Sequence, residues 1–222
     1  IWNGARAVTD ADARRTGRGI LLVVAGPSGV GKGTMIAGLR ERHPRVEWSI
    51  SCTTRAPRAG EVDGGDYHFV SHQEFARMRR AGELLEWAVV HGAEFYGTPR
   101  APVEDALEHG RDIVLEIDFQ GARSVRHALP EAVLVFVAPP SAQALTDRLA
   151  GRNTEDAGAV ARRLRSARIE FGHMGMFQFL IVNDVLEDAV DALEAIYVAE
   201  KHRLRRARWQ ELQRRLLDDM EA

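Results

Sequence analysis

The segment Gly19-Ile-Leu-Leu-Val-Val-Ala25, followed by Gly26-Pro-Ser-Gly-Val-Gly-Lys32, decides the fold of this chain. Its first part is a short apolar run rich in β-branched side chains, which is typical of a buried strand. The glycines permit unusual backbone angles, and the residues from Thr34 to His43 have the pattern of an amphipathic helix. A strand, a glycine-rich turn and a helix in this order predict a loop whose backbone amides bind phosphate at a helix N-terminus.

Lys32 supports this prediction, because it is one of only two lysines beside 28 arginines. A lysine in such a chain indicates a need for a compact point charge, which here would reach the β and γ phosphates of a nucleoside triphosphate. The next residue is Gly33, where the usual pattern has Ser or Thr to meet Mg²⁺. We expect the hydroxyl of Thr34 to meet the metal instead, directly or through water. The residues predicted to bind ATP here are Gly26, Pro27, Ser28, Gly29, Val30, Gly31, Lys32, Gly33 and Thr34.

The composition bounds the class of protein. A chain of 222 residues can bury a sizeable core as one domain, and a net charge of −2 gives no global electrostatic reason to expect nucleic acid or a membrane as partner. The single cysteine, Cys52, excludes an internal disulfide and fits a reducing cytosol, so we expect a cytoplasmic protein. No segment has the roughly 20 apolar residues of a membrane span. Residues 1–18 are polar, and we expect a flexible N-terminal extension there.

Apolar runs and helical patterns alternate along the rest of the chain, which predicts a parallel sheet wrapped by helices. The expected strands of this sheet are Ile20–Ala25, Ile113–Ile117, Val133–Ala138 and Phe179–Val182.

Three other segments break or extend the alternation. Between about residues 49 and 99 the pattern changes to strand-like pieces, Tyr67–Val70 and Leu84–Val90, around a helix that opens with the capping box Ser71-x-x-Glu74. Residues 151–158 are polar and contain glycine, so we expect a mobile loop. Residues 186 to about 219 are expected to be helical, and their basic part, 201–208, to be a solvated helix face rather than a phosphate or RNA patch.

Arg55 and Arg58 lie three residues apart with Pro57 between them, on an extended or turning segment. Arginine forks bind phosphate oxygens in a bidentate manner, so this pair suits a phosphate monoester. By itself the pair is weak evidence, since arginine pairs are common in this chain, and exposed arginines that only confer solubility are the more frequent explanation of such a pair.

The surrounding blocks resemble guanylate kinases. From Ser51 the chain reads S-x-T-T-R-x-P-R-x-G-E, then G-x-D-Y-x-F-V, L-x-E-W-A and F-Y-G-T, followed by E-I-D-x-Q-G-A, A-P-P-S, R-L-x-G-R and L-I-V-N-D. These blocks run in order from about Gly19 to Asp184. The resemblance implies an α/β fold with a three-layer P-loop kinase core around a parallel sheet, an inserted GMP-binding α+β subdomain and a mobile lid. The implied boundaries are a domain at 19–222, with core 19–50 and 100–222, insert about 51–99 and lid about 148–163.

The resemblance also implies roles for the acceptor residues. Ser51 and Glu86 would read guanine, whose N1–H and N2–H₂ are adjacent donors that one carboxylate accepts, whereas adenine would leave Glu86 unpaired. The residues expected to bind the GMP phosphate are Arg55, Arg58, Tyr67 and Tyr96. Thr98 would lie near the base, and Asp118 near the sugar or base.

Further implied roles concern the metal and the lid. Glu116 and Asp118 leave the end of the strand at 113–117, two residues apart and therefore on one strand face. Acidic groups at such a strand end help to hold Mg²⁺, partly through water. The family pattern usually has Asp where this chain has Glu116, and which of the two carboxylates meets the metal stays open. Arginines of the lid would close over the γ-phosphoryl group and stabilise its charge. The lid residues carried over are Arg148, Arg152 and Arg163, and Asn183 is expected near the adenine of ATP.

The function implied is ATP + GMP ⇌ ADP + GDP with Mg²⁺, and dGMP as a further acceptor, in purine nucleotide metabolism. We expect ATP and GMP as ligands, and neither nucleic acid nor a membrane; the sequence does not determine protein partners or oligomeric state. Two alternatives remain at this point. One is a guanylate-kinase-like module that binds proteins without catalysis, and the other is a related enzyme with another acceptor, such as adenylate kinase, whose loop the pair Gly33-Thr34 resembles.

Overall fold

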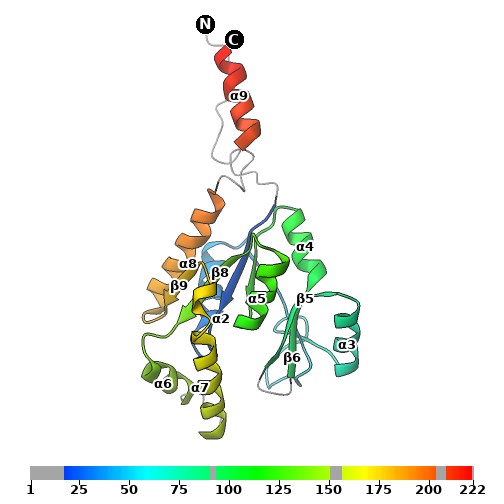
Figure 1. The fold of residues 1–222 in the computed structure, drawn as a ribbon, viewed down its shortest axis with the longest axis vertical. Coiled ribbons are helices and arrows are strands. Elements are labelled where there is room, and N and C mark those ends of the chain that lie inside the picture. The colour runs from blue at the N-terminus through cyan, green and yellow to red at the C-terminus, as the bar shows by residue number, and fades with distance from the viewer. Residues whose placement is uncertain (1–17, 91–93, 151–156, 204–208, 222) are drawn as a thin grey trace.

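The computed structural model describes residues 18–90, 94–150, 157–203 and 209–221 (Figure 1). The expected flexible extension therefore lies outside the described residues, except for Arg18. Most of the loop expected at 151–158 lies outside them as well.

A five-stranded parallel sheet forms the centre of the molecule (Figure 1). The four predicted strands are confirmed as β1 (Leu21–Ala25), β7 (Ile113–Glu116), β8 (Val133–Ala138) and β9 (Phe179–Val182), all paired in parallel. The pattern did not predict β2 (Glu47–Trp48), which is too short to show a periodicity and completes the order β2-β7-β1-β8-β9. The loop after β1 therefore leaves the middle of the sheet at its carboxyl edge, where ligands of such folds bind.

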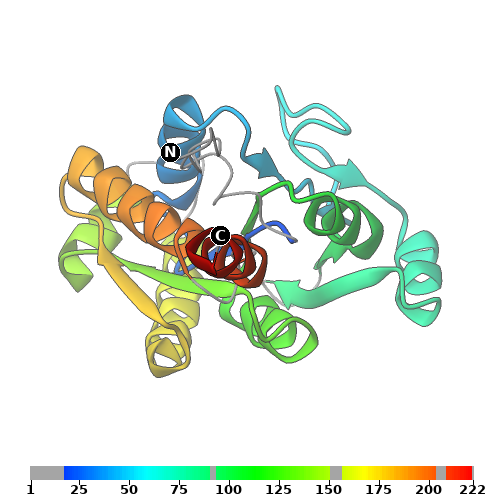
Figure 2. The same ribbon diagram turned by 90° about the horizontal axis from the view of Figure 1, so that it is seen from above.

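Helices cover both faces of this sheet, which makes three layers (Figure 2). Successive residues of a strand point to opposite faces. Leu22 and Val24 of β1 therefore pack against α2 (Lys32–Arg42) and α8 (Leu186–Lys201), while Leu21 and Val23 pack against α4 (Arg100–Glu108) and α5 (Phe119–Ala128). The predicted α/β architecture is confirmed.

A second, four-stranded sheet lies beside the core and within the predicted insert (Figure 1). Its order is β4 (His68–Phe69), β3 (Cys52–Thr53), β6 (Glu94–Pro99) and β5 (Leu84–Val90), and α5 of the core packs against β5. The helix α3 (His72–Arg80) begins at Ser71, whose side chain accepts a hydrogen bond from the Glu74 amide at 3.1 Å. Half of the predicted capping box is thus confirmed, whereas the Glu74 carboxylate pairs with Arg77.

The C-terminal segment corrects two expectations. The helix expected from residue 186 to about 219 is interrupted after Lys201, and α9 (Trp209–Glu221) follows as a separate helix that stands apart from the sheets in Figure 1. In the basic run 201–208, Lys201 is not on a freely solvated face, because its ammonium group pairs with the buried carboxylate of Asp112. Residues 204–208 of this run lie outside the described residues. Asp112 also accepts hydrogen bonds from the Ile20 amide at 2.9 Å and the Tyr197 hydroxyl at 2.7 Å, which fastens α8 to the sheet.

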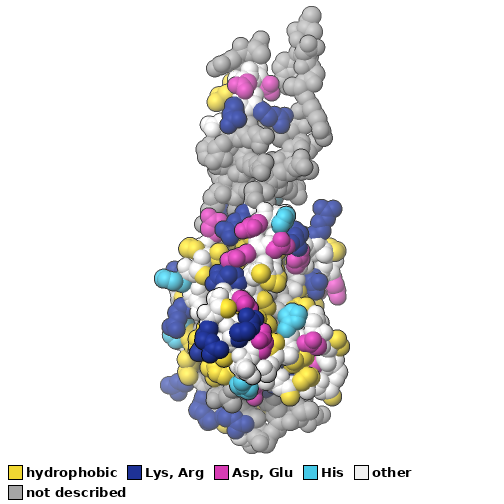
Figure 3. Space-filling view, turned by 90° about the vertical axis from the view of Figure 1, so that its right-hand side faces the viewer, with side chains coloured by type: hydrophobic (Ala, Val, Ile, Leu, Met, Phe, Trp, Pro, Cys, Tyr) yellow, Lys and Arg dark blue, Asp and Glu magenta, His cyan; other side chains and the backbone are white. Residues whose placement is uncertain are grey.

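The surface mixes charges of both signs. Figure 3 shows the face that carries α3, where basic and acidic side chains are interspersed. On α3 itself, Arg77 contacts both Glu74 and Glu83. Within the residues that the structure describes, every helix is too short or too polar to cross a membrane.

Candidate active site

A cleft of about 930 Å³ opens at the carboxyl edge of the parallel sheet, between the loop after β1 and the second sheet. Most of the predicted site residues line it, although they come from both sheets and from α7 (Ala157–Phe171). The predicted residues that line the cleft are Gly26, Ser28, Gly29, Gly31, Lys32, Gly33, Thr34, Ser51, Arg55, Arg58, Tyr67, Glu86, Tyr96, Glu116, Asp118 and Arg163. The described residues Pro27, Val30, Thr98, Arg148 and Asn183 are outside its lining, and Arg152 lies outside the described residues.

The loop after β1 needs its glycines. Gly29 and Gly31 have φ of +86° and +95°, in the left-handed region that favours glycine. A Cβ atom on Gly31 would come within 2.5 Å of the Asn183 side-chain nitrogen. That nitrogen donates a hydrogen bond to the Val30 carbonyl at 2.8 Å, and Asn183 is buried. Asn183 therefore supports the backbone of the loop at Val30 and Gly31. Its expected contact with adenine stays a prediction.

Lys32 is the first residue of α2 and lies inside the loop. Its ammonium nitrogen donates hydrogen bonds to the carbonyl oxygens of Gly26 at 2.7 Å and Pro27 at 3.1 Å. The Glu116 carboxylate is 3.9 Å from the same nitrogen. Lys32 is therefore a positive charge held at the mouth of the loop by weak acceptors, for which phosphate oxygens are stronger partners.

The structure gives a steric reason for Gly33. A Cβ atom there would lie 3.2 Å from Oε2 of Glu116 and 3.8 Å from the ring of Trp48. A side chain at this position would therefore require the Glu116 carboxylate, at the end of β7, to shift by a few tenths of an ångström. Thr34 is exposed in the cleft, so its hydroxyl is accessible.

The residues in this part of the cleft fit a magnesium ion. Within the described part of the chain there is no group of three or more His, Cys, Asp or Glu that could enclose a metal. Mg²⁺ does not require such a cage, because it keeps several waters and takes only one or two protein oxygens besides substrate phosphates. A hydroxyl from Thr34 and a carboxylate from Glu116 beside the phosphate loop supply that donor set.

Arg55 forms the centre of a second anion site. Its two terminal nitrogens each lie 2.9 Å from an oxygen of Glu61, and its Nε donates to the Tyr96 hydroxyl at 3.0 Å. The guanidinium group also lies over the Tyr67 ring, 5.4 Å from its centre. Glu61 further accepts a hydrogen bond from the Arg58 amide at 2.7 Å. The simple reading of Arg55 as an exposed solubilising charge is wrong, because only 14% of its side chain is accessible.

The carboxylate of Glu61 is the group that pairs with Arg55 in this cluster. It binds in the fork of Arg55 in the bidentate manner that a phosphate would use. The hydrogen bonds from Arg55 and the Arg58 amide lower the pKa of Glu61 to about 2.

Glu86 is a buried carboxylate at the other end of the cleft. Only 5% of it is accessible, and its Oε1 accepts a hydrogen bond from the Thr98 hydroxyl at 2.6 Å. Burial raises the pKa of Glu86 to about 7, and the neighbouring charge of Asp118 adds to the effect. The backbone of Gly121 allows this approach, since a Cβ atom there would lie 2.5 Å from Oε2 of Glu86. Thr98 is thus behind Glu86 and orients it.

Asp118 lies beyond the strand rather than on it. The strand β7 ends at Glu116, and Asp118 is the N-cap of α5, so the expectation that both carboxylates share one strand face is wrong. Oδ1 of Asp118 accepts a hydrogen bond from the Gly121 amide at 2.8 Å, and Oδ2 accepts one from the Gln120 side chain at 3.1 Å. The Asp118 carboxylate therefore also has a structural role, because it caps the N-terminus of α5.

The lid segment contributes Arg163 to the cleft, one turn before Ser166 on the same face of α7. Arg148 lies on α6 (Ala142–Ala150) and does not reach the lining. One further residue of α7, Glu170, is 8% accessible and lines the cleft. The sequence carried a signal for it, because Leu164, Ala167 and Phe171 form an apolar stripe on α7, and Glu170 is a carboxylate beside that stripe.

Sequence reasoning did not assign several residues that line the cleft. Glu61 and Gln120 stood within quoted blocks, so their positions were available, whereas Arg40 of α2 and Ser166 of α7 carried no pattern of their own. The cleft-lining residues without a predicted role include Arg40, Trp48, Ser49, Glu61, Phe119, Gln120, Ser166 and Glu170.

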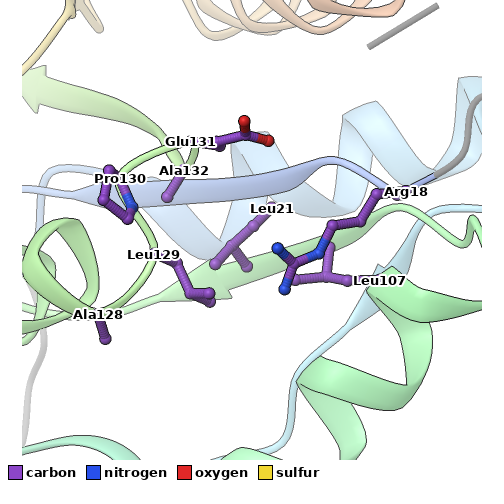
Figure 4. A pocket seen from close by; sticks show the side chains of 9 residues that line it. Arg18, Leu21, Leu107, Ala128, Leu129, Pro130, Glu131 and Ala132 are labelled. Carbon is purple, nitrogen blue, oxygen red and sulfur yellow. The ribbon is translucent and has the colours of Figure 1, made fainter. Parts of the chain in front are cut away.

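A smaller pocket of about 120 Å³ lies at the opposite edge of the sheet (Figure 4). Leu21, Leu107 and Leu129 line it, together with Arg18 and Glu131. Its volume is too small for a nucleotide, and it is far from the phosphate loop along β1. The large cleft is therefore the site on which a function can be built.

The fold and the cleft together define a P-loop α/β protein in which Lys32 and Arg55 line one cleft. Comparison with known proteins gives the family. The family model for guanylate kinase matches residues 18–200. A guanylate kinase from Nocardia farcinica is 51% identical over 189 residues, which are 85% of this chain and 98% of that protein. One from Rhodococcus jostii is 52% identical over 182 residues, covering 82% and 88% of the two chains.

A solved structure agrees with these relatives. The crystal structure of guanylate kinase from Anaplasma phagocytophilum superposes with a TM-score of 0.74 at 35% identity, covering 89% of this chain and 94% of that chain. The chain belongs to the guanylate kinase family.

Proposed function

We propose that this chain catalyses ATP + GMP ⇌ ADP + GDP and accepts dGMP as well, which places it in purine nucleotide metabolism. The observation that carries the proposal is the buried carboxylate of Glu86, in the same cleft as the phosphate loop. Arg55 and Lys32 also line this cleft, which supports a base reader, an acceptor-phosphate site and a donor-phosphate site within one cavity.

Glu86 supports guanine as the base. With Oε1 held by Thr98, the carboxylate has acceptor capacity left on both oxygens for the adjacent N1–H and N2–H₂ donors of guanine. Adenine presents an acceptor at N1, so it would leave this buried carboxylate without a partner. Ser51 lines the same end of the cleft and adds a hydroxyl for the base.

Arg55, Arg58, Tyr67 and Tyr96 bind the GMP phosphate. A phosphate dianion enters the fork of Arg55 in place of the Glu61 carboxylate, while Arg58 and the tyrosine hydroxyls supply further donors. The acceptor phosphate is largely ionised at neutral pH. The reaction therefore needs alignment of this oxygen with the γ-phosphoryl group and no general base.

Lys32 and the amides of the loop bind the β and γ phosphates of ATP. Thr34 and Glu116 hold Mg²⁺, because both face the cleft beside Lys32 whereas Asp118 is engaged as a helix cap. When bound, the ion neutralises charge on the triphosphate. Glu116 rather than Asp118 is assigned to the metal because Asp118 already accepts hydrogen bonds as the cap of α5. Asp118 is left to the sugar or base of GMP.

The arginines Arg148, Arg152 and Arg163 complete the site by moving over the transferred group. Arg163 already lines the cleft, and Arg148 requires motion of its helix to reach it. Closure of these segments and of the second sheet excludes water, which would otherwise hydrolyse ATP.

An acceptor panel tests the proposal. ADP production is measured with ATP, Mg²⁺ and, in turn, GMP, dGMP, AMP and UMP. We expect turnover with GMP and dGMP and very little with the other two. The absence of GMP-dependent ADP production would favour a binding module without catalysis, and preference for AMP would favour an enzyme with another acceptor. The family match and the intact loop around Lys32 argue against both alternatives.

A further inference from the structure

Glu170 is a buried carboxylate that the proposed reaction does not yet use. It lies near the C-terminal end of α7, is only 8% accessible and lines the cleft. Its Oε2 is fully buried and has no hydrogen-bond partner among the described residues. A buried carboxylate oxygen without a partner is costly, so such a group indicates a ligand or another function.

The part of α7 that carries Glu170 is fixed to the core. His173, three residues further on, stacks on the ring of Phe119 at the start of α5, with ring centres 4.5 Å apart and 8° between the planes. The 3₁₀ turn Met174–Met176 follows, and the Met176 carbonyl accepts a hydrogen bond from Arg126 of α5 at 2.6 Å. Glu170 is therefore at the anchored end of the lid helix, whereas Arg163 is two turns nearer the end that must move.

Charges on both sides of the cleft act on Glu170. Burial raises the pKa of its carboxyl group to about 7; Lys32 of the phosphate loop opposes this effect and Asp118 adds to it. Asp118 in turn acts on Glu86, the base reader. Glu170 thus lines the same cleft as Glu86 and Lys32, and is within electrostatic reach of Lys32 and of Asp118.

The chemistry of a nucleoside monophosphate limits what Glu170 can bind there. The base donors have Glu86 and Ser51, and the phosphate is an acceptor that takes Arg55 and Arg58. The remaining donors are the ribose hydroxyls, which lie between base and phosphate. Asp118 is a second acceptor for the sugar or base, but its two oxygens already accept hydrogen bonds from the Gly121 amide and the Gln120 side chain, whereas Oε2 of Glu170 accepts none. The other candidate is a water molecule on the metal, but Thr34 and Glu116 already supply protein oxygens next to the phosphate loop.

We infer that Oε2 of Glu170 accepts a hydrogen bond from a ribose hydroxyl of the acceptor nucleotide, which makes Glu170 a specificity-determining residue for the sugar. The inference rests on the proposed use of GMP as acceptor. It gives the buried oxygen its missing donor and fixes the nucleotide at a third point, between Glu86 and Arg55.

Variants of Glu170 compared on three acceptors test this inference. The values of kcat/KM are measured for GMP, 2′-deoxy-GMP and 3′-deoxy-GMP with the unaltered chain, Glu170→Ala and Glu170→Gln. We expect Glu170→Ala to reduce kcat/KM for GMP about 10- to 100-fold, the range for loss of a hydrogen bond to a charged group. The acceptor that lacks the contacted hydroxyl should lose less than about threefold, which identifies the 2′ or the 3′ position. The amide oxygen of Glu170→Gln can still accept a hydrogen bond, so this variant should retain more activity.

The control is Glu200→Gln, which removes a carboxylate that is 2% accessible but lies on α8, away from the cleft. It should change all three acceptors by one common, small factor. Equal losses on all three acceptors in Glu170→Ala and Glu170→Gln would overturn the inference. A raised Mg²⁺ requirement without any dependence on the acceptor would also overturn it and place Glu170 at the metal. If the unaltered chain shows no turnover of GMP, the proposed function itself fails, which is a separate result.

Discussion

The substitution Glu86→Gln tests the reading of the base directly. It keeps the shape of the side chain and an oxygen that can accept the 2.6 Å hydrogen bond from Thr98. It replaces the other carboxylate oxygen by an NH₂ group, which is a donor. The two adjacent donors of guanine, N1–H and N2–H₂, would then face one acceptor and one donor in a site that is only 5% accessible.

The magnitude follows from the number of hydrogen bonds affected. A hydrogen bond to a charged group contributes about 1.5–3 kcal/mol, and a buried donor without a partner costs about 1–3 kcal/mol. Their overlap gives a loss of about 3–4 kcal/mol, so kcat/KM for GMP should fall about 100- to 1,000-fold. The KM for ATP should change less than about twofold, because the hydrogen bond of Glu86 is to Thr98 of the second sheet and not to the phosphate loop.

The pH dependence gives an independent check, because the carboxyl group must be ionised to accept both guanine donors. Its pKa is raised to about 7, so the ionised fraction falls from about nine-tenths at pH 8 to about one-tenth at pH 6. The KM for GMP should therefore rise about tenfold between pH 8 and pH 6. The phosphate of GMP also takes up a proton near pH 6. The KM for GMP of Glu86→Gln, measured at the same two pH values, reports the effect of phosphate protonation alone, because the amide does not titrate in this range.

The assay couples ADP formation to NADH oxidation at saturating ATP and then at saturating GMP, at pH 8 and pH 6. A thermal melt at pH 8 accompanies it. Because the pKa of Glu86 is raised, the folded state binds the proton of its carboxyl group more tightly than the unfolded state does. The protonated carboxyl group therefore stabilises the fold fully below pH 4.5, and this stabilisation is lost as the pH rises through about 7. Removal of the charge should thus leave the melting temperature at pH 8 unchanged or higher. Equal losses for GMP and ATP, or the same pH dependence in both proteins, would refute the reasoning.

Three further predictions concern the loop, the metal and the fold. Lys32→Ala should lower kcat at least 100-fold and leave the thermal melt unchanged, because among the described residues the Lys32 ammonium group contacts two loop carbonyls and Glu116. Near-normal turnover would contradict its placement at the transferred phosphate. Thr34→Ala should raise the Mg²⁺ concentration required for half-maximal activity several-fold in a magnesium titration, without changing the KM for GMP. An unchanged titration would exclude the Thr34 hydroxyl from the metal. Asp112→Ala should lower the free energy of unfolding by about 3–5 kcal/mol in a urea titration. The substitution leaves Lys201, Tyr197 and the Ile20 amide without their shared acceptor. A loss below about 1 kcal/mol would mean that this network contributes little to holding α8 against the sheet.

The residues of the cleft show how far sequence reasoning reaches. Strands β1, β7, β8 and β9 were predictable, because a buried parallel strand is a continuous apolar run. Strands β2 and β3 were not, since two residues carry no period and exist only through pairing with distant strands. The phosphate loop and the acceptor blocks were readable as local patterns, whereas Glu61 in the fork of Arg55 depends on how a turn folds back on itself.

The sequence by itself determined the class of fold, the phosphate loop with Lys32 and the family-like acceptor blocks, because each depends on residues that are neighbours along the chain. Only the tertiary structure decided that Asp118 caps a helix, that Asn183 braces the loop below Gly31, and that Lys201 closes a buried network on Asp112. It also decided that Glu86 and Glu170 are buried carboxylates acted on by the same Asp118. These properties arise from burial and from contacts between segments far apart in the chain, and a local pattern contains neither.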